Sequence, residues 1–173
     1  MVLLESNELD YGAGFKDFEL VDTRNGKSFS SSSELNKEIV VISFICNHCP
    51  YVVRIIEDFA KLAKETQDFV QFVAISANDP DYREEDSPDN MKIFAEEHDF
   101  VFPYLFDETQ EVAKSFDAVC TPDIFVYKKM NGKYGLVYHA RFEDLVKALN
   151  DLKTRDKVGF QALPSAGCSI KWH

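Results

Sequence analysis

Two cysteines, Cys46 and Cys49, are separated by two residues in the segment 44–50. The β-branched, apolar run 39–45 predicts a strand buried on both faces, and the apolar spacing after Cys49 predicts a helix. A thiol where a strand becomes a helix loses its proton more easily than a free cysteine, because unpaired amides and the helix dipole stabilise the thiolate. The pattern therefore predicts a redox dithiol, in which Cys46 is the nucleophile and Cys49 is the more shielded, resolving thiol.

The residues beside the two thiols adjust this chemistry. An imidazolium at His48, between the cysteines, favours the thiolate and therefore the reduced pair, which makes the disulfide a stronger oxidant. Pro50 is tolerated in the first helical turn, where no backbone donor is needed. We expect Asn47 and Pro50 to contact the substrate, and the redox-active disulfide needs no further cofactor.

A C-x-x-C pair is also half of a tetrahedral zinc site, which is the main alternative. No second C-x-x-C is present, so a closed zinc shell has to recruit Cys120, Cys168 or His139. A redox role without a metal is therefore favoured, and two inert buried cysteines remain as a third interpretation. Cys120 is either a third thiol near the dithiol or, more commonly, a packing residue. Cys168 is expected in a docked tail rather than a reactive one.

The elements around this segment predict an α/β fold, with a central mixed sheet flanked by helices. Residues 70–77 read as a second buried strand, so that strand, helix and strand form a right-handed βαβ unit with Cys46 at its functional edge. Two hairpins are expected, one turning at Asn25-Gly26 and one at Asn131-Gly132.

Three further helices follow from capping residues and apolar spacing. Ser87 as cap and Pro88 as first residue begin a helix that ends near His98, and Asp107 with Gln110 begins a short one that ends at Phe116. A final helix over residues 143–153 covers the sheet.

The length, charge and apolar content of the chain limit the remaining possibilities. The 173 residues suit one domain, 1–173, with an N-terminal extension over 1–36 and a C-terminal tail over 155–173. The net charge of −11, from 30 acidic and 19 basic side chains, disfavours nucleic acid and anionic membranes as partners. The start of the chain lacks the layout of a secretory signal, and no apolar run reaches the length of a membrane span, so a cytoplasmic location is expected.

The sequence resembles the thioredoxin-like superfamily, in particular its redoxin branch of alkyl-hydroperoxide-reductase/thiol-specific-antioxidant proteins and TlpA/ResA-type thiol reductases. The resemblance rests on the strand, the run from Cys46 to Pro50 and the helix, followed later by Thr121-Pro122-Asp123 leading into a strand. The chain also looks like a subgroup with a Cys-Asn-His-Cys-Pro-Tyr core and a Gly-Cys-Ser-Ile-Lys-Trp tail, here residues 46–51 and 167–172.

This resemblance implies a role for Thr121 and Pro122. Their peptide bond is expected to be cis and to face the dithiol, with the backbone of Thr121 pairing to an extended segment of the partner. Cis peptide bonds are energetically accessible almost only before proline, where they cost about 0.5–1 kcal/mol relative to trans. From the sequence alone, a trans proline at the start of a strand is the commoner arrangement.

Three features depart from thioredoxins proper. Ile45 stands where they have Trp, so partner contacts must differ. Val40 stands where they have a buried Asp that assists proton transfer to the inner thiol, so this role is vacant or falls to Asn78 or Asp79. The chain also runs almost directly from Arg141 into the last helix, where related chains have a longer loop.

Other polar clusters are read as structural. The loop 79–89 carries six acidic residues and one Arg, and a solvated loop is favoured over one that selects basic partners. His98 and His139 have no companions at ligand spacing and are treated as structural.

Together these observations predict an enzyme, a thiol-disulfide oxidoreductase acting on protein or small-molecule disulfides with an unidentified electron donor. The first rival is a thiol peroxidase, but the pattern P-x-x-x-T-x-x-C is not met, because Ser43 and Ile39 occupy the Thr and Pro positions. The second rival is a metal-binding or redox-sensing module.

Overall fold

The computed structural model describes residues 3–8, 11 and 14–173. Residues 1–2, 9–10 and 12–13 of the expected N-terminal extension lie outside this description. In the described part of the chain, every helix falls short of the length and hydrophobicity that a membrane span requires.

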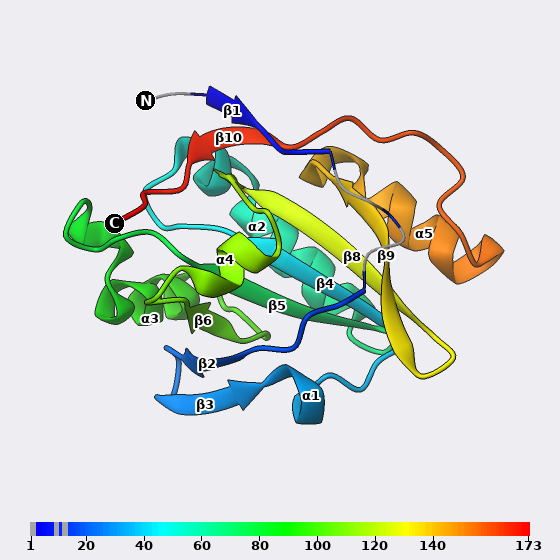
Figure 1. Cartoon of the computed structure of the whole chain (residues 1–173), viewed down its shortest axis with the longest axis horizontal. Helices are drawn as coiled ribbons and strands as arrows, with labels where there is room; N and C mark the ends of the chain where they lie inside the picture. Colours follow the sequence, from blue (N-terminus) through cyan, green and yellow to red (C-terminus); the bar gives the residue numbers. More distant parts are fainter. Residues whose placement is uncertain (1–2, 9–10, 12–13) are drawn as a thin grey trace.

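A seven-stranded mixed sheet, in the order β3-β2-β6-β5-β4-β8-β9, forms the centre of the molecule (Figure 1). The strands β4 (Ile39–Phe44) and β5 (Val70–Ser76) pair in parallel, and all six side chains of β4 are buried. The strand β6 (Tyr104–Phe106) continues the parallel half, whereas β8 (Asp123–Met130) and β9 (Lys133–Ala140) form the antiparallel half. The mixed sheet predicted from the sequence is confirmed.

Both predicted hairpins are present. The strands β2 (Glu19–Asp22) and β3 (Lys27–Ser30) are antiparallel and turn through Gly26, whose φ of +73° suits a residue without a side chain. The turn between β8 and β9 has positive φ at both Asn131 and Gly132, as a two-residue hairpin turn requires. A single helical turn, α1 (Ser31–Glu34), follows β3.

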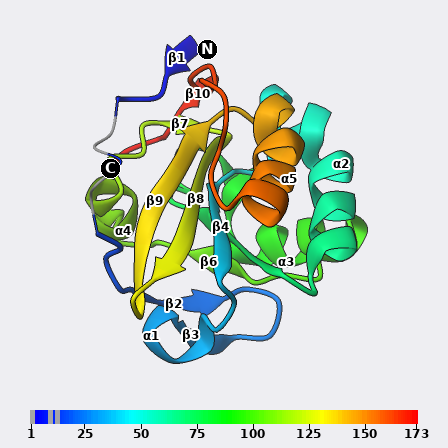
Figure 2. The ribbon, with the colours of Figure 1, turned by 90° about the vertical axis from the view of Figure 1, so that its right-hand side faces the viewer.

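Three helices, α2 (Pro50–Thr66), α3 (Pro88–Glu97) and α5 (Leu145–Arg155), pack on one face of the sheet. Figure 2 shows α2 and α5 side by side on this face and α4 (Glu111–Ser115) on the opposite one. Strand side chains alternate between the two faces, so that Val41 belongs to the helix-covered core and its neighbours Val40 and Ile42 belong to the other core. The sheet is therefore buried on both sides, as its apolar strands predict.

Two helix starts differ from the sequence prediction. The short helix α4 begins at Glu111 rather than Asp107, because Gln110 adopts a left-handed conformation (φ 63°). Asp107 still caps it from outside, since its carboxylate accepts the backbone N–H groups of Val112 and Ala113. The last helix begins at Leu145, after a 3₁₀ turn, η2 (Phe142–Asp144), which follows closely on β9 with no long loop between them.

A second sheet, not predicted from the sequence, joins the two ends of the chain to its middle. Its order is β1-β10-β7, formed by β1 (Leu3–Glu5), β10 (Ala166–Ser169) and β7 (Cys120–Thr121). The C-terminal strand lies between the other two (Figure 2), and Cys168 is the register partner of Thr121. The tail is thus part of the structure next to the strand-to-helix turn.

Candidate active site

The two cysteines of the C-x-x-C pair lie at the predicted strand-to-helix turn. The backbone N–H of Ile45 still donates to the carbonyl of Ile75, and α2 begins at Pro50 with Cys49 as its N-cap residue. Both Cys46 and Cys49 are thiols, both are fully buried, and a hydrogen bond joins their side chains. The expectation that Cys46 is the less shielded thiol is therefore wrong in this state.

Thr121 lies against both thiols. Its Oγ1 is 3.3 Å from the Sγ of Cys46, and its carbonyl oxygen is 3.3 Å from the Sγ of Cys49. The Thr121–Pro122 peptide bond is cis, the isomer that the resemblance implies. The fold thus brings two segments that are more than seventy residues apart in the sequence into one site.

The backbone edge of Thr121 is not open to a partner, which corrects the role implied by the resemblance. The tail strand β10 already pairs with it, and Thr121 is only 2% exposed. Gly167 makes this approach possible, because a Cβ at that position would lie 1.9 Å from the carbonyl oxygen of Thr121. A partner strand can pair here only after β10 has left.

Cys168 was expected in a docked tail and is docked there, but it also reaches the dithiol. Its Sγ lies 2.8 Å from the Sγ of Cys49, and the residue is 1% exposed. Cys120, the other thiol considered from the sequence, is buried, and it pairs in register with Ser169. Burial raises the pKa of the Cys120 thiol. The tail cysteine, and not Cys120, therefore touches the C-x-x-C pair.

The hydrogen bond between the two thiols shifts their pKa values in opposite directions. The hydrogen bond to Cys49, burial and the charge of Asp86 all raise the pKa of Cys46. Donation by Cys46, helped by the thiol of Cys168, lowers the pKa of Cys49 to about 4 despite burial. This reverses the order of acidity expected from the sequence. The reason is the hydrogen bond between the two thiols, in which Cys46 donates to Cys49.

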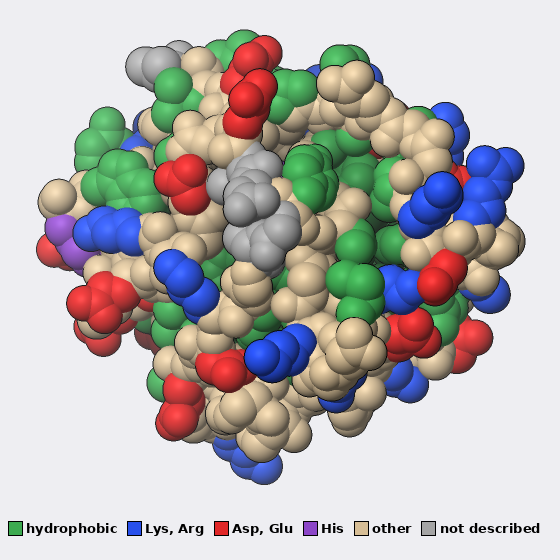
Figure 3. All heavy atoms as spheres, turned by 45° about the vertical axis from the view of Figure 1, so that its right-hand side comes forward, with side chains coloured by type: hydrophobic (Ala, Val, Ile, Leu, Met, Phe, Trp, Pro, Cys, Tyr) green, Lys and Arg blue, Asp and Glu red, His purple; other side chains and the backbone are tan. Residues whose placement is uncertain are grey.

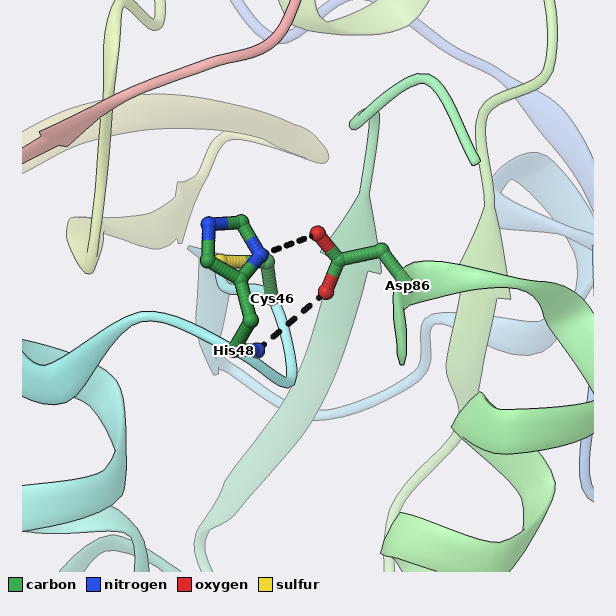
Figure 4. Close-up of side chains that lie close together, drawn as sticks. All are labelled: Cys46, His48 and Asp86. Atoms are coloured by element: carbon green, nitrogen blue, oxygen red, sulfur yellow. Dashed lines mark hydrogen bonds and ion pairs between the residues drawn. The ribbon is translucent and has the colours of Figure 1, made fainter. Parts of the chain in front are cut away.

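Asp86 is the carboxylate beside the dithiol. It ends the 3₁₀ turn η1 (Glu84–Asp86), is completely buried, and accepts the backbone N–H groups of Asn47 and His48 at 2.8 and 3.3 Å. It also accepts hydrogen bonds from Nδ1 of His48 at 2.5 Å (Figure 4) and from Nδ2 of Asn78 at 2.8 Å. Burial alone raises the pKa of Asp86, but the hydrogen bonds from His48 and Asn78 outweigh it, so that its pKa is lowered. The carboxylate is therefore charged and holds the turn between the two thiols.

Asp86, rather than Asn78 or Asp79, is the residue that contacts the His48 ring. The side-chain nitrogen of Asn78 donates to Asp86, and its side-chain oxygen accepts a hydrogen bond from the backbone N–H of Lys171. The Asp79 carboxylate pairs with His173 at 3.3 Å. Asp86 also differs from the other acidic residues of its loop, because it is buried. Most of the others are exposed, as expected for a solvated loop.

Cys46, His48 and Asp86 offer three atoms of metal-ligating type within 4.8 Å of one another. Both carboxylate oxygens of Asp86 already accept hydrogen bonds, so a metal ion would have to displace His48 or Asn78. This set also differs from the zinc shells considered from the sequence. His139, one of their candidate ligands, instead binds the buried carboxylate of Asp123 at 2.7 Å.

The remaining predicted site residues divide into two groups. Asn47 is tied inward, because its amide nitrogen donates to the carbonyl of Glu85 and its oxygen accepts the hydroxyl of Tyr104. Pro50 is exposed as the first residue of α2. Asp86, Tyr104 and Cys168 are site residues that the sequence did not predict.

A well-formed cavity lies away from the dithiol. It has a volume of about 910 Å³ and lies between the N-terminal segment, β9 and the C-terminal tail. Figure 3 shows hydrophobic side chains gathered in a hollow on this side of the molecule, amid scattered acidic and basic groups. Cys46, Cys49, His48 and Cys168 do not line this cavity.

The fold and the dithiol define a thioredoxin-like protein of the redoxin type. The sequence profile of the AhpC/TSA family matches residues 11–135, and the chain belongs to this family. No curated protein sequence matches the chain.

Solved structures share this fold. An uncharacterized conserved protein from Geobacillus kaustophilus is 37% identical, with a TM-score of 0.94 over 100% of this chain and 97% of that one. At the level of the fold, the chain is similar to peroxidoxin BcpB from Mycobacterium tuberculosis (24% identity, TM-score 0.65, 82% and 95% covered). It is also similar to a thiol-disulfide oxidoreductase from Bacteroides fragilis (15% identity, TM-score 0.66, 81% and 99% covered).

Proposed function

We propose that this protein is a thiol-disulfide oxidoreductase that exchanges electrons with a protein or small-molecule disulfide through Cys46 and Cys49. The observation that carries the proposal is the hydrogen-bonded thiol pair at the start of α2, one member of which has a pKa of about 4. The thiolate is the reactive form of cysteine in disulfide exchange. No metal or organic cofactor takes part in the proposed reaction.

In the first step, Cys46 attacks a sulfur of the partner disulfide. A new bond forms between Cys46 and that sulfur, and the other partner sulfur leaves as a thiolate. Cys46 must first lose its proton, and the nearby His48 ring, oriented by Asp86, is placed to accept it. Asp86 is a positioning residue here, because it acts through His48.

In the second step, Cys49 attacks the Sγ of Cys46. The Cys46–Cys49 bond forms, the mixed disulfide breaks, and the partner's second sulfur leaves as a thiolate. The partner has then gained two electrons and the protein has lost two. The hydrogen bond from Cys46 that most lowers the pKa of Cys49 is lost in the mixed disulfide, but the one from the thiol of Cys168 remains and favours the attacking thiolate. An electron donor, not yet identified, must return the protein to its dithiol form.

The direction of exchange depends on the compartment. In the cytoplasm, where we expect the protein, reducing conditions would keep the pair as a dithiol and make the protein a reductant. Access also matters, because both sulfurs are buried and β10 covers the edge of Thr121. A small disulfide or a displaced tail meets this constraint more easily than a rigid protein surface.

The test is a titration of the purified protein in glutathione buffers, with alkylation of the remaining thiols and mass measurement at each ratio. We expect two thiols to be lost together in the wild type, and this paired loss to disappear in Cys46→Ser and Cys49→Ser but to persist in the control Cys120→Ser. Cys46 and Cys49 remaining alkylatable at every ratio would reject the proposal.

The same purified protein also distinguishes the two alternative functions, a thiol peroxidase and a metal-binding module. A thiol peroxidase would consume hydrogen peroxide stoichiometrically and keep doing so after loss of Cys49, whereas the proposed exchange needs both cysteines. A metal module would bind zinc tightly and show no exchange with any disulfide.

A further inference from the structure

The Sγ of Cys49 has two sulfur neighbours and not one. Cys46 is hydrogen-bonded to it from the same turn, and Cys168 lies 2.8 Å from it on the C-terminal strand. A disulfide forms without backbone movement only between cysteines that are already close. Cys49 therefore has two possible disulfide partners. The C-x-x-C spacing predicts Cys46 but does not predict Cys168.

The position of Cys168 is fixed by the sheet that carries it. The strand β10 is paired on one side with β1 and on the other with β7. Gly167 lets the tail approach the carbonyl of Thr121 more closely than a side chain would permit, and the backbone N–H of Ile170 donates to the carbonyl of Val119. Beyond the strand, the backbone N–H of Lys171 donates to the side chain of Asn78, which in turn holds Asp86. The tail thiol is thus anchored on both sides of Cys168 at the site itself.

We propose that Cys168 is a third redox cysteine, which forms a disulfide with Cys49 after the Cys46–Cys49 bond has formed. This inference rests on the proposed function, because it needs Cys49 to be oxidised by exchange. The thiolate of Cys168 attacks the Sγ of Cys49, the Cys49–Cys168 bond forms, the Cys46–Cys49 bond breaks, and Cys46 leaves as a thiolate. The proton lost by Cys168 passes to Cys46 or to solvent, and no net oxidation occurs.

The rearrangement has a chemical consequence for the site. It returns Cys46, the sulfur that meets the partner, to its thiol form while the oxidising equivalents remain on the chain. It also ties the tail covalently to α2 and so locks β10 over the edge of Thr121. The thiol of Cys168 is protonated in the reduced state, because burial and the neighbouring Cys49 raise its pKa to about 12. That anion is removed once Cys49 is in a disulfide, and the charge of Lys171 favours the thiolate of Cys168.

Peptide mapping of the wild-type protein tests this directly. The reduced protein is oxidised with oxidised glutathione, quenched with acid, alkylated and digested with trypsin under acidic conditions that prevent reshuffling. Residues 38–54 contain both Cys46 and Cys49, residues 158–171 contain only Cys168, and residues 115–128 contain only Cys120. We expect 38–54 to be recovered in two forms, one with an internal disulfide and one joined to 158–171.

Variants identify the sulfur atoms. The cross-link should persist in the control Cys120→Ala and should be lost in Cys46→Ala, Cys49→Ala and Cys168→Ala, because the proposed step starts from the Cys46–Cys49 disulfide. Gly167→Ala keeps all four thiols but displaces the strand, so the cross-linked share should fall several-fold while the internal Cys46–Cys49 disulfide still forms.

The outcomes separate this inference from the proposed function. If the wild type forms the internal disulfide while Cys168 is alkylated at every degree of oxidation, the inference is overturned and the proposed function stands. If neither Cys46 nor Cys49 enters any disulfide, both fail. Recovery of the joined peptides from the wild type, with loss in Cys49→Ala, supports the inference.

Discussion

The carboxylate of Asp86 accepts Nδ1 of His48 at 2.5 Å, although 38 positions of sequence separate the two residues. The same carboxylate accepts the backbone N–H groups of Asn47 and His48, so one buried charge fixes both the ring and the chain between the two thiols. A buried carboxylate is tolerated only when hydrogen bonds replace its water. Here the four donors come from the turn that it organises and from Asn78.

Asp86→Asn should therefore destabilise the fold. The amide cannot accept from all four donors, and its own NH₂ group faces donors, so we expect a loss of about 3 kcal/mol in the free energy of unfolding. Urea unfolding near neutral pH measures it. Glu85→Gln is the matched control, an exposed acid in the same 3₁₀ turn, and should change stability by less than about 0.5 kcal/mol.

The difference in stability between the wild type and Asp86→Asn should also depend on pH. The folded-state pKa of Asp86 is lowered, so its charge contributes stability above the unfolded pKa of about 3.9, and this contribution is lost as pH falls through the folded value. The stability difference between wild type and Asp86→Asn should therefore narrow as the pH is lowered below about 4. A difference that stays constant down to the lowest accessible pH would contradict the charged state assigned to Asp86.

His48→Gln should slow the first exchange step without abolishing it. Removing a positioned proton acceptor costs about 10²-fold or more in rate, and the remaining reaction should depend more steeply on hydroxide concentration. Stopped-flow exchange with a small aromatic disulfide, followed over pH, gives the rate. If Asp86 acts through His48, Asp86→Asn should lower the rate too, and the double variant should be little slower than His48→Gln alone.

The central fold could be predicted from the sequence because its signals are local. The apolar run of β4 is buried on both faces, the Asn-Gly pairs turn the two hairpins, and Ser87 caps α3 by accepting the backbone N–H of Asn90. The C-x-x-C pair falls at the strand-to-helix turn for the same reason. These features need only residues that are neighbours in the chain.

The rest of the site depends on contacts between distant segments. Nothing local separates Asp86 from the other five acids of its loop, and it is buried only because the turn η1 folds back onto the dithiol. Cys168 lies 119 positions from Cys49 and reaches it through a strand inserted between β1 and β7, a pairing with no signature of its own. The order of acidity also depends on a side-chain contact, because the hydrogen bond from Cys46 is the largest cause that lowers the pKa of Cys49.

Phe59→Ala tests the core that supports this turn. Phe59 lies in α2, is 1% exposed, and its ring meets those of Phe72 and Phe102 at centroid distances of 5.3 and 5.5 Å. Loss of this ring should cost about 3–5 kcal/mol in the free energy of unfolding, measured by urea denaturation. Val53→Ala, on the exposed side of the same helix, should cost less than about 1 kcal/mol. Equal effects would show that α2 does not pack as described.

Cys46→Ala tests the electrostatics of the dithiol. Donation from the Cys46 thiol is the largest cause that lowers the pKa of Cys49 to about 4, so its removal should raise that pKa by about one to two pH units. The ultraviolet absorbance of the thiolate, followed over pH in the reduced protein, measures the change, with Cys120→Ala as the control that leaves it in place. Cys168→Ala should raise the same pKa by less, because the Cys168 thiol is the weaker of the two donors. A pKa of Cys49 that is unchanged in Cys46→Ala would mean that the helix start alone stabilises the thiolate, and that the two sulfurs do not share a proton.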